Sequence, residues 1–475
     1  MTSMLSKSNM PSPKSKASVG APEIFAVWSD GLEGRFDAPY YRPYLRELLN
    51  QVLKQKHYRL GDVITEMTGG ATPEVTGDFY MEEGGVPFLR VQNVTEMGID
   101  LDDVKYIKPE VHETMLKRSQ LKKDDLVFTI TGRIGSVAVV PDGFVGNINQ
   151  HSVRFHLRPE IDGVKILPEY VAAFFNTKAG RDLSLRYTTG GTRPALDYEG
   201  LKNLVFPLPS EKKQKEIVAE LQEAYEKKRA IEKEAEKIIA SVDTFVLGEL
   251  GITATGGAAS RTPEVFAVWN DVMSRRLDPM FFHPARLAAI KAVKECGLPL
   301  KPLAEVAEFR RELVDEIPEG MSYIGLENVA SGSGELVDTG EKEGIGTAFV
   351  FKKGDVLFPK LRPYLNKVYY ADHDGVCSTE FHVLKAKACS PEYLFAFLSR
   401  SVIVEQTSRL MTGNTLPRLQ TEDIEELFIP LPSEQKQGKI VAGLKSLLEK
   451  ARTLQASATT MLSAAQEKSA QAILS

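Results

Sequence analysis

The sequence is poor in cysteine and has no long apolar run. Its three cysteines, Cys296, Cys377 and Cys389, are too few and too widely spaced for a disulfide framework, which indicates a reducing compartment. No window approaches the roughly 20 uninterrupted apolar residues of a membrane span. Met1–Ala21 also lacks the apolar core of a signal peptide. We therefore expect a cytoplasmic protein that does not enter the membrane.

An excess of positive charge is also missing. The chain has 475 residues and a net charge of −5, whereas phosphate contacts require clustered Lys and Arg. Any recognition of DNA must then be local or shared with partners. The length predicts roughly two to four domains of ordinary globular composition. The opening segment, residues 1–21, is rich in Ser, Lys and Pro and is typical of a disordered tail.

What the chain does have is repetition. FPLPSEKKQKEIVAEL (Phe206–Leu221) returns as IPLPSEQKQGKIVAGL (Ile429–Leu444), and PEIFAVW (Pro22–Trp28) returns as PEVFAVW (Pro263–Trp269). The pairs LKKDDLVF and FKKGDVLF, LPEYVAAFF and SPEYLFAFL, and TGGTRPAL and TGNTLPRL follow in the same order. This indicates a tandem duplication in which a common frame carries variable loops.

Each copy predicts a mixed domain. Short β-branched and aromatic runs bounded by Gly, Pro and Asp favour strands, and PEYVAAFFNTKAGRDL and PEYLFAFLSRSVIVEQ have the spacing of amphipathic helices. We expect the α+β class, with two tandem mixed α/β domains. The predicted boundaries are a first domain at 22–208, a central helix at 209–250, a linker at 251–262, a second domain at 263–431 and a C-terminal helix at 432–475.

The PLPSE stretch predicts the start of a long helix in each copy. Its prolines exclude a helix interior, and Ser210 and Ser433 are good N-caps. Apolar residues then alternate by four and three, which predicts a coiled-coil seam. The seam residues are Ile217, Leu221, Ile231, Ile238 and Val242 in the first helix and Ile440, Leu444, Leu447, Leu454 and Met461 in the second.

Each seam needs an apolar partner, because burying one Ile or Leu contributes roughly 1.5 to 3 kcal/mol. Pairing of the two helices with each other is the simplest solution. An antiparallel pair lets the second domain stay compact, so we expect two domains at opposite ends of a two-helix spacer with approximate two-fold symmetry. The alternative is that both helices are core elements of two ordinary domains.

Candidate catalytic motifs are weak. DAPY (Asp37–Tyr40) resembles the D-P-P-Y element of adenine methyltransferases, but its counterpart is DPMF (Asp278–Phe281), and no Gly-rich turn for a methyl donor precedes either. The E-x-K triplet at Glu434 is typical of a helix start, and no phosphate-binding loop appears. His373, Cys377, His382 and Cys389 have loosely metal-like spacing without a counterpart in the first copy. We expect no catalytic residue, no metal site and no cofactor on this chain.

Polar residues in matching loops of the copies are candidates to contact bases. Arg suits guanine edges, and Asn or Gln suits adenine edges. Taken singly, each is more often a turn or surface residue than a reader of bases. The candidates are Gln92, Asn93, Thr131, Arg133, Asn147, Asn149, Gln150 and His151 in the first copy, and Glu327, Asn328, Lys360, Arg362, Tyr364, Asn366 and Lys367 in the second.

The chain resembles the DNA-specificity subunit of type I restriction-modification systems over almost everything after the tail. Three stretches carry the resemblance: the paired PLPSE-x-K-Q segments with their long helices, Asp125–Phe155 in the first domain and Gly354–Leu384 in the second. The resemblance implies two target-recognition domains, each reading one half of a split DNA sequence. It adds Arg186, Thr192, Arg193, Asn414, Thr415 and Arg418, in the TGGT and TGNT regions, to the expected DNA contacts. Those segments would otherwise be simple turns.

The resemblance also implies partners. Two adenine methyltransferase subunits would dock on the helices and bind S-adenosylmethionine, and a separate ATP- and Mg-dependent restriction subunit would cleave DNA. This chain would then be a non-catalytic subunit for recognition and assembly. A competing function is a coiled-coil scaffold whose end domains bind proteins, and an autonomous methyltransferase is a third, which would be active alone with the methyl donor.

Overall fold

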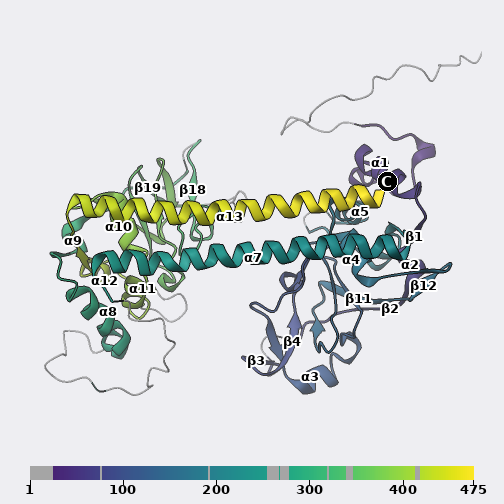
Figure 1. The fold of residues 1–475 in the computed structure, drawn as a ribbon, viewed down its shortest axis with the longest axis horizontal. Helices are drawn as coiled ribbons and strands as arrows, with labels where there is room; N and C mark the ends of the chain where they lie inside the picture. The colour runs from purple at the N-terminus through teal and green to yellow at the C-terminus, as the bar shows by residue number, and fades with distance from the viewer. Residues whose placement is uncertain are drawn as a thin grey trace, which may run out of the picture. The chain divides into compact units, whose positions relative to one another are not determined.

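A computed structural model describes residues 25–74, 77–190, 193–253, 267, 278–317, 320–337, 346–411 and 418–474. The predicted tail and most of the predicted linker lie outside these residues. The chain divides into two compact units, one holding residues up to Glu226 together with those from Met461 onward, and the other holding Lys227–Thr460. Each unit contains one copy of the repeat and part of both long helices, α7 (Glu211–Leu250) and α13 (Glu434–Leu474) (Figure 1).

The first unit is built around an antiparallel sheet of order β2-β11-β8-β9, with α4 and α5 packed beside it. Its strands are β1 (His57–Arg59), β2 (Ile64–Gly69), β3 (Tyr80–Met81), β4 (Val86–Leu89), β5 (Val94–Thr95), β6 (Gly98–Ile99), β7 (Lys105–Ile107), β8 (Leu126–Thr129), β9 (Val137–Val139), β10 (Asn147–Ile148), β11 (Ser152–Leu157), β12 (Glu160–Ile161), β13 (Val164–Lys165) and β14 (Val205–Pro207). Its short helices are α1 (Pro43–Leu53), α2 (Leu60–Val63), α3 (Pro109–Glu113), α4 (Pro168–Asn176), α5 (Lys178–Arg186), α6 (Tyr198–Lys202) and the 3₁₀ turns η1 (Ser29–Gly31), η2 (Ala38–Tyr41), η3 (Val91–Asn93) and η4 (Lys117–Ser119).

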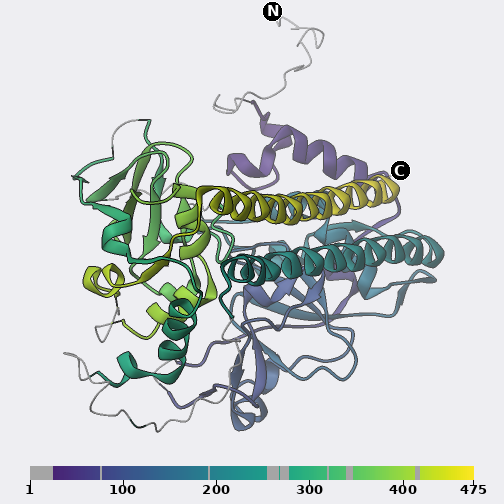
Figure 2. The same ribbon diagram turned by 60° about the vertical axis from the view of Figure 1, so that its left-hand side comes forward.

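The second unit repeats this plan with a sheet of order β16-β23-β20-β21. Its strands are drawn in green in Figure 2. Its strands are β15 (Leu300–Pro302), β16 (Ala307–Arg310), β17 (Leu313–Val314), β18 (Tyr323–Ile324), β19 (Ala348–Phe351), β20 (Val356–Pro359), β21 (Tyr369–Tyr370), β22 (Gly375–Ser378), β23 (Phe381–Ala386) and β24 (Phe428–Pro430). Its short helices are α8 (Pro284–Lys294), α9 (Leu303–Val306), α10 (Pro391–Leu398), α11 (Ser401–Thr407), α12 (Thr421–Glu425) and the 3₁₀ turns η5 (Pro279–Phe282), η6 (Leu326–Asn328) and η7 (Pro363–Leu365). β18 pairs in parallel with β22, as β4 does with β10. The expected mixed α/β domain is therefore present in both copies.

The two long helices run antiparallel to each other in each unit. In the second unit, Lys439 near the start of α13 forms an ion pair with Glu249 near the end of α7 at 2.9 Å. In the first unit, Lys468 near the end of α13 pairs with Glu220 near the start of α7 at 2.5 Å. All of the predicted seam residues are buried or half-buried. Several of them also enter the domain cores: Ile217 and Leu221 join the first core, and Val242, Ile440 and Leu444 join the second.

The repeated PLPSE-x-K-Q and PEY stretches fasten each long helix to its own domain. The buried amide of Gln214 accepts a hydrogen bond from the Leu167 backbone N–H at 3.0 Å and donates to the Lys165 carbonyl at 2.8 Å. Its counterpart Gln437 accepts from Ser390 N–H at 3.0 Å and donates to the Pro432 carbonyl at 3.0 Å. This pair of interactions is one physical reason why the stretch occurs twice.

Two buried tyrosines strengthen the same junction. The hydroxyl of Tyr170 donates to the Pro207 carbonyl at 2.8 Å, and that of Tyr393 donates to the Pro430 carbonyl at 2.7 Å. Both side chains are fully buried. The PEY tyrosine thus satisfies a carbonyl of the PLP segment at the point where the chain turns into the long helix.

Replacing Gln437 by alanine is expected to lower the free energy of unfolding by about 2 to 3 kcal/mol, because a buried backbone N–H and a buried carbonyl lose their partner. Gln435 is exposed in the same helical turn, so Gln435→Ala is the matched control and should change stability by less than about 0.5 kcal/mol. Chemical denaturation followed by circular dichroism measures both. Equal stability of the two variants would contradict the role assigned to Gln437.

The described residues contain neither a membrane-spanning helix nor a metal-binding group. No helix among them is long and apolar enough to cross a lipid bilayer. Within the same ranges, no group of three or more His, Cys, Asp or Glu side chains is arranged to hold a metal ion.

Candidate nucleic-acid interface

Three chain segments meet at the end of strand β8 in the first domain. The backbone N–H of Ile130 donates to the His151 carbonyl at 2.9 Å, and the Ile130 carbonyl accepts from Leu196 N–H at 2.9 Å. The next residue, Thr131, forms a β-bridge with Ala195. This junction brings together the TGRIG turn, the NINQH turn and the TGGTRPAL segment, which are distant in sequence.

Polar side chains of these segments are joined by hydrogen bonds. Thr131 Oγ1 lies 2.6 Å from His151 Nδ1, and His151 Nε2 lies 3.2 Å from Gln150 Nε2. Gln150 also contacts the hydroxyl of Thr72. Gln150 is exposed and His151 is half-buried, so the set lies at the surface of the domain.

Cationic and amide side chains surround the junction. Arg133, three residues after Ile130, and Arg193, two residues before Ala195, are both exposed. Gln92 in η3 is also exposed, with its amide donating to Asp103 at 2.8 Å. The η3 turn is close to the TGRIG turn, because a Cβ on Gly132 would lie 3.9 Å from Val91 Cγ1. The first domain therefore gathers hydrogen-bonding groups and positive charge at one strand end.

The second domain has the same junction at the end of β20. Lys360 N–H donates to the Glu380 carbonyl at 2.7 Å, and the Lys360 carbonyl accepts from Leu419 N–H at 2.9 Å. Leu361 forms a β-bridge with Arg418. These backbone contacts match those of the first domain one for one, so Lys360 takes the place of Ile130 and Glu380 that of His151.

The side chains at this second junction are charged. Arg418 donates to the Glu380 carboxylate through Nη2 at 2.6 Å and through Nε at 2.9 Å, and this bond raises the pKa of Arg418. Lys360 Nζ donates to the Thr379 carbonyl at 2.8 Å, and burial lowers the pKa of Lys360. Arg311 lies close enough to lower the pKa of Lys360 further. Within this cluster, cations outnumber carboxylates.

The residues next to the second junction differ in how far they are exposed to solvent. Arg362 and Tyr364 are exposed on the turn after β20, where Arg362 has a φ of 51°. Glu327 is half-buried in η6. Burial lowers the pKa of His382, on β23, to about 3, so its ring is neutral at physiological pH and adds no charge to the cluster.

Several predicted base-contacting residues are instead structural. Asn93 is fully buried and accepts from Arg90 N–H at 2.9 Å, closing the η3 turn. Asn328 does the same in the second copy by accepting from Gly325 N–H at 2.8 Å. Asn147 is fully buried, and its amide donates to the Leu116 carbonyl at 2.9 Å. In this structure those amides bond to the backbone of their own domain, and their role as base contacts stays a prediction.

Arg186 and Asn149, also predicted contacts, are buried. The Arg186 side chain is 1% exposed, lies 3.8 Å above the ring of Tyr40 and donates to the Tyr40 carbonyl at 3.0 Å. Asn149 is buried and accepts from His151 N–H at 3.2 Å, so it shapes the turn that presents His151. Buried side chains with these partners cannot reach a base edge in this conformation.

The remaining predicted contacts are two tethered residues and three that are not described. Asn366 donates to the Ser399 carbonyl at 2.9 Å, and Lys367 donates to the Leu326 carbonyl at 2.9 Å, so both hold the loop after β20 in place. Thr192, Asn414 and Thr415 lie outside the described residues.

Sequence reasoning missed Glu380, Arg311 and Thr72. Glu380 lies in a turn where the sequence offered no candidate, and only the alignment of NQH with STE, through the matching strands β11 and β23, assigns it to the position of His151. Arg311 and Thr72 lie in segments that the repeat does not align, so no signal in the sequence distinguished them.

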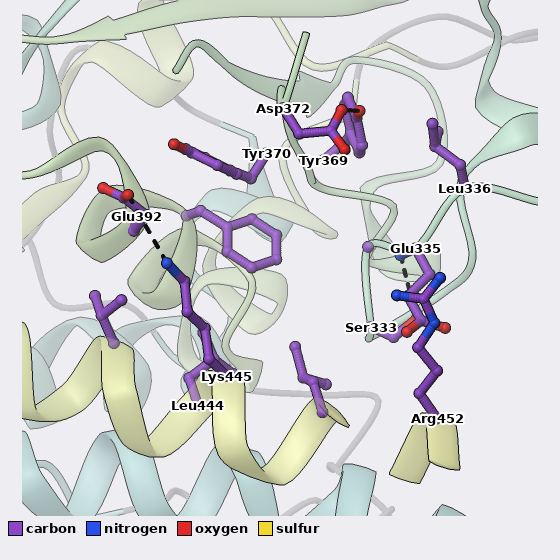
Figure 3. A pocket seen from close by; sticks show the side chains of 14 residues that line it. Ser333, Glu335, Leu336, Tyr369, Tyr370, Asp372, Glu392, Leu444, Lys445 and Arg452 are labelled. Atoms are coloured by element: carbon purple, nitrogen blue, oxygen red, sulfur yellow. Dashed lines mark hydrogen bonds and ion pairs between the residues drawn. The ribbon is translucent and has the colours of Figure 1, made fainter. Parts of the chain in front are cut away.

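A groove recurs beside the start of each long helix. In the second domain it encloses about 580 Å³ between α13, α10, β21 and the loop at Ser333 (Figure 3). Apolar and charged side chains line it together, and Lys445 pairs with Glu392 at 3.9 Å across it. The first domain has a counterpart of about 210 Å³ lined by Glu169 and Leu221, which match Glu392 and Leu444. The groove therefore belongs to the repeated frame.

The sequence pattern of the family described as "Type I restriction modification DNA specificity domain" matches residues 54–240 and 318–459. The specificity subunit of the Escherichia coli type I restriction enzyme EcoDI is 23% identical over 277 residues, which is 56% of this chain and 60% of that subunit. The EcoBI specificity subunit, also from E. coli, is 26% identical over 161 residues, 34% of this chain and 33% of its own length. The matched segments thus span less than two thirds of these relatives.

Two solved structures match most of the chain at low sequence identity and low TM-score. The S subunit of a type I restriction-modification system from M. genitalium is 14% identical with a TM-score of 0.37, covering 87% of this chain and 95% of its own. The HsdS subunit from Thermoanaerobacter tengcongensis is 15% identical with a TM-score of 0.33, covering 88% and 95%. Because the family pattern covers more than half of the chain and falls on both copies, this chain belongs to the type I restriction-modification DNA specificity family.

Proposed function

We propose that this chain is the DNA-recognition and scaffold subunit of a type I restriction-modification complex, with each domain reading one half of a split DNA sequence. The observation that carries the proposal is the repeated junction. Both domains make the same backbone hydrogen bonds at Ile130 and Lys360, yet they present different polar side chains there. A constant frame with variable chemistry is what two different half-sites would require.

The placement of charge is compatible with DNA binding by a chain of net charge −5. Phosphate contacts depend on local clusters of Lys and Arg, not on the total charge. Arg133 and Arg193 lie near the first junction, and Lys360 and Arg418 lie at the second. Partner subunits would supply the remaining phosphate contacts.

The proposal assigns the chemistry to partners. Two adenine methyltransferase subunits would carry S-adenosylmethionine, and a restriction subunit, where one accompanies the system, would use ATP and Mg²⁺. This chain would catalyse no reaction. The repeated groove beside α7 and α13 supports two partners of one kind, because a partner that binds twice needs an equivalent surface in each copy.

The proposal is tested with the chain assembled with its methyltransferase partner and mixed with random duplex DNA. Selection and sequencing of bound duplexes should yield a split motif with two defined halves around an undefined spacer. Capture of duplexes without any sequence enrichment would contradict the proposal and favour the alternative, a scaffold whose end domains bind proteins.

A charge reversal on the groove rim should change the stoichiometry of assembly. Arg452 is exposed on α13 at the groove, so Arg452→Glu together with Leu336→Asp should reduce the assembly from two methyltransferase subunits per chain to one. Native mass spectrometry measures this directly. Lys450→Glu, exposed on the same helix but outside the groove, is the control and should retain two. Two bound subunits in the groove variant would contradict this assignment.

A further inference from the structure

Glu380 occupies an unusual place for a carboxylate. It sits in the turn between β22 and β23, and its backbone carbonyl accepts from Lys360 at the junction proposed to face DNA. Within a few ångströms of a phosphate backbone, an uncompensated carboxylate would weaken binding. Here the carboxylate is bound by Arg418, and Lys360 and Arg311 lie close by.

The geometry of the pair fixes the guanidinium plane. Glu380 Oε1 accepts from Arg418 Nη2 at 2.6 Å and Oε2 accepts from Nε at 2.9 Å. The carboxylate therefore occupies the Nε–Nη2 edge of the fork. Guanine O6 and N7 are recognised end-on by Nη1 and Nη2, and the bidentate bond to Glu380 fixes the plane in which these nitrogens lie.

Stability of the fold does not account for the pair. The side chains of Arg418 and Glu380 are 42% and 24% exposed, and ion pairs at such exposure contribute little to stability. The first domain forms the same junction without a charged pair, with Ala195 at the position of Arg418 and His151 at that of Glu380. The junction folds with either set, so the charged set is specific to the second half-site.

We propose that Glu380 is a positioning residue that holds Arg418 in the orientation for reading a guanine in the second DNA half-site. This inference rests on the proposed function. Glu380 acts through Arg418. It holds the guanidinium in one orientation, so that the arginine does not turn toward a base other than guanine. The first half-site is read by the Thr131, Gln150 and His151 set and does not depend on Glu380.

The test uses the complete assembled complex and duplexes in which each position of the second half-site carries each of the four bases in turn. Wild type should prefer guanine at one position, and Glu380→Gln, which keeps the shape and removes the charge, should reduce that preference about tenfold. Arg418→Lys should reduce it at the same position, and the double variant should lose no more than the single ones. Preferences in the first half-site serve as the internal reference and should not change.

The outcomes distinguish a failure of the proposed function from a failure of the role of Glu380. If wild type shows no base preference in either half-site, the proposed function fails. If wild type has a split motif and Glu380→Gln retains every preference, the role of Glu380 is overturned while the function stands. Equal loss in both half-sites, with an unchanged melting temperature, would also overturn it, because the effect would then not be confined to the second domain.

Discussion

Replacing Leu444 by aspartate is expected to unfold the second domain. Leu444 is 3% exposed and packs in the core with Val246, Ile440 and Phe397 among others. Losing a buried leucine costs about 2 to 5 kcal/mol, and burying an unpaired carboxylate adds several more. The total approaches the whole stability of a typical domain, about 5 to 15 kcal/mol.

Hydrogen exchange resolved by mass spectrometry measures this domain by domain. Amide protection should be lost in β20, β23 and α10, which belong to the same unit as Leu444. Ala442→Asp places the same charge on an exposed position of the same helix and should keep the protection. Retained protection in Leu444→Asp would contradict the core position of the residue. Leu221 is also a core residue. Aspartate at either leucine is therefore expected to unfold its domain, so a loss of partner docking in these variants would follow from unfolding.

Removing Arg133 and Arg362 together is expected to lower affinity for the cognate duplex by roughly a hundredfold or more. Both side chains are exposed on the turns that follow β8 and β20. An arginine that contacts a guanine contributes about 1 to 3 kcal/mol, or roughly 5- to 150-fold in affinity. The two losses should be close to additive, because each arginine would serve a different half-site.

Titration of labelled duplex with the assembled complex measures this effect at several salt concentrations. A base contact would relax the preference at one position, whereas a phosphate contact would weaken all sequences and reduce the salt slope by about 1. Arg158→Ala and Lys385→Ala are matched controls. Both side chains are exposed near the C-terminal ends of β11 and β23, the strands that pair with β8 and β20, and these ends lie away from the two turns. Unchanged affinity in the double variant would contradict the placement of the interface at these turns.

The repeated frame was predictable from the sequence because its causes are local. The PLPSE helix start, the heptad seam and the β-branched runs depend on residue type and spacing, and the structure has long helices from Glu211 and Glu434 and strands in the expected regions. The repeat itself also constrained the answer, because any element expected in one copy was expected in the other.

Much of the candidate site was not predictable, because a polar residue in a loop does not reveal its partner. Asn147 bonds to a backbone carbonyl 31 residues away, and Arg186 bonds to one 146 residues away. Only the tertiary fold decides that these side chains point inward, whereas Arg133 and Arg362 point to solvent. Glu380 is the reverse case. Its negative charge gives no reason to expect it at a DNA-binding surface, and only the structure shows that it is paired with Arg418.

If this one chain specifies a split DNA site, the pattern of adenine methylation in the source genome should depend on this gene. Long-read sequencing that detects N6-methyladenine should find a motif of two short halves around an undefined spacer, and that motif should vanish when the gene is deleted. Restoring the gene with Glu380→Gln should return the first half intact and the second half relaxed at one position. Methylation that is identical in the presence and absence of the gene, in cells that express it together with its methyltransferase, would contradict the account.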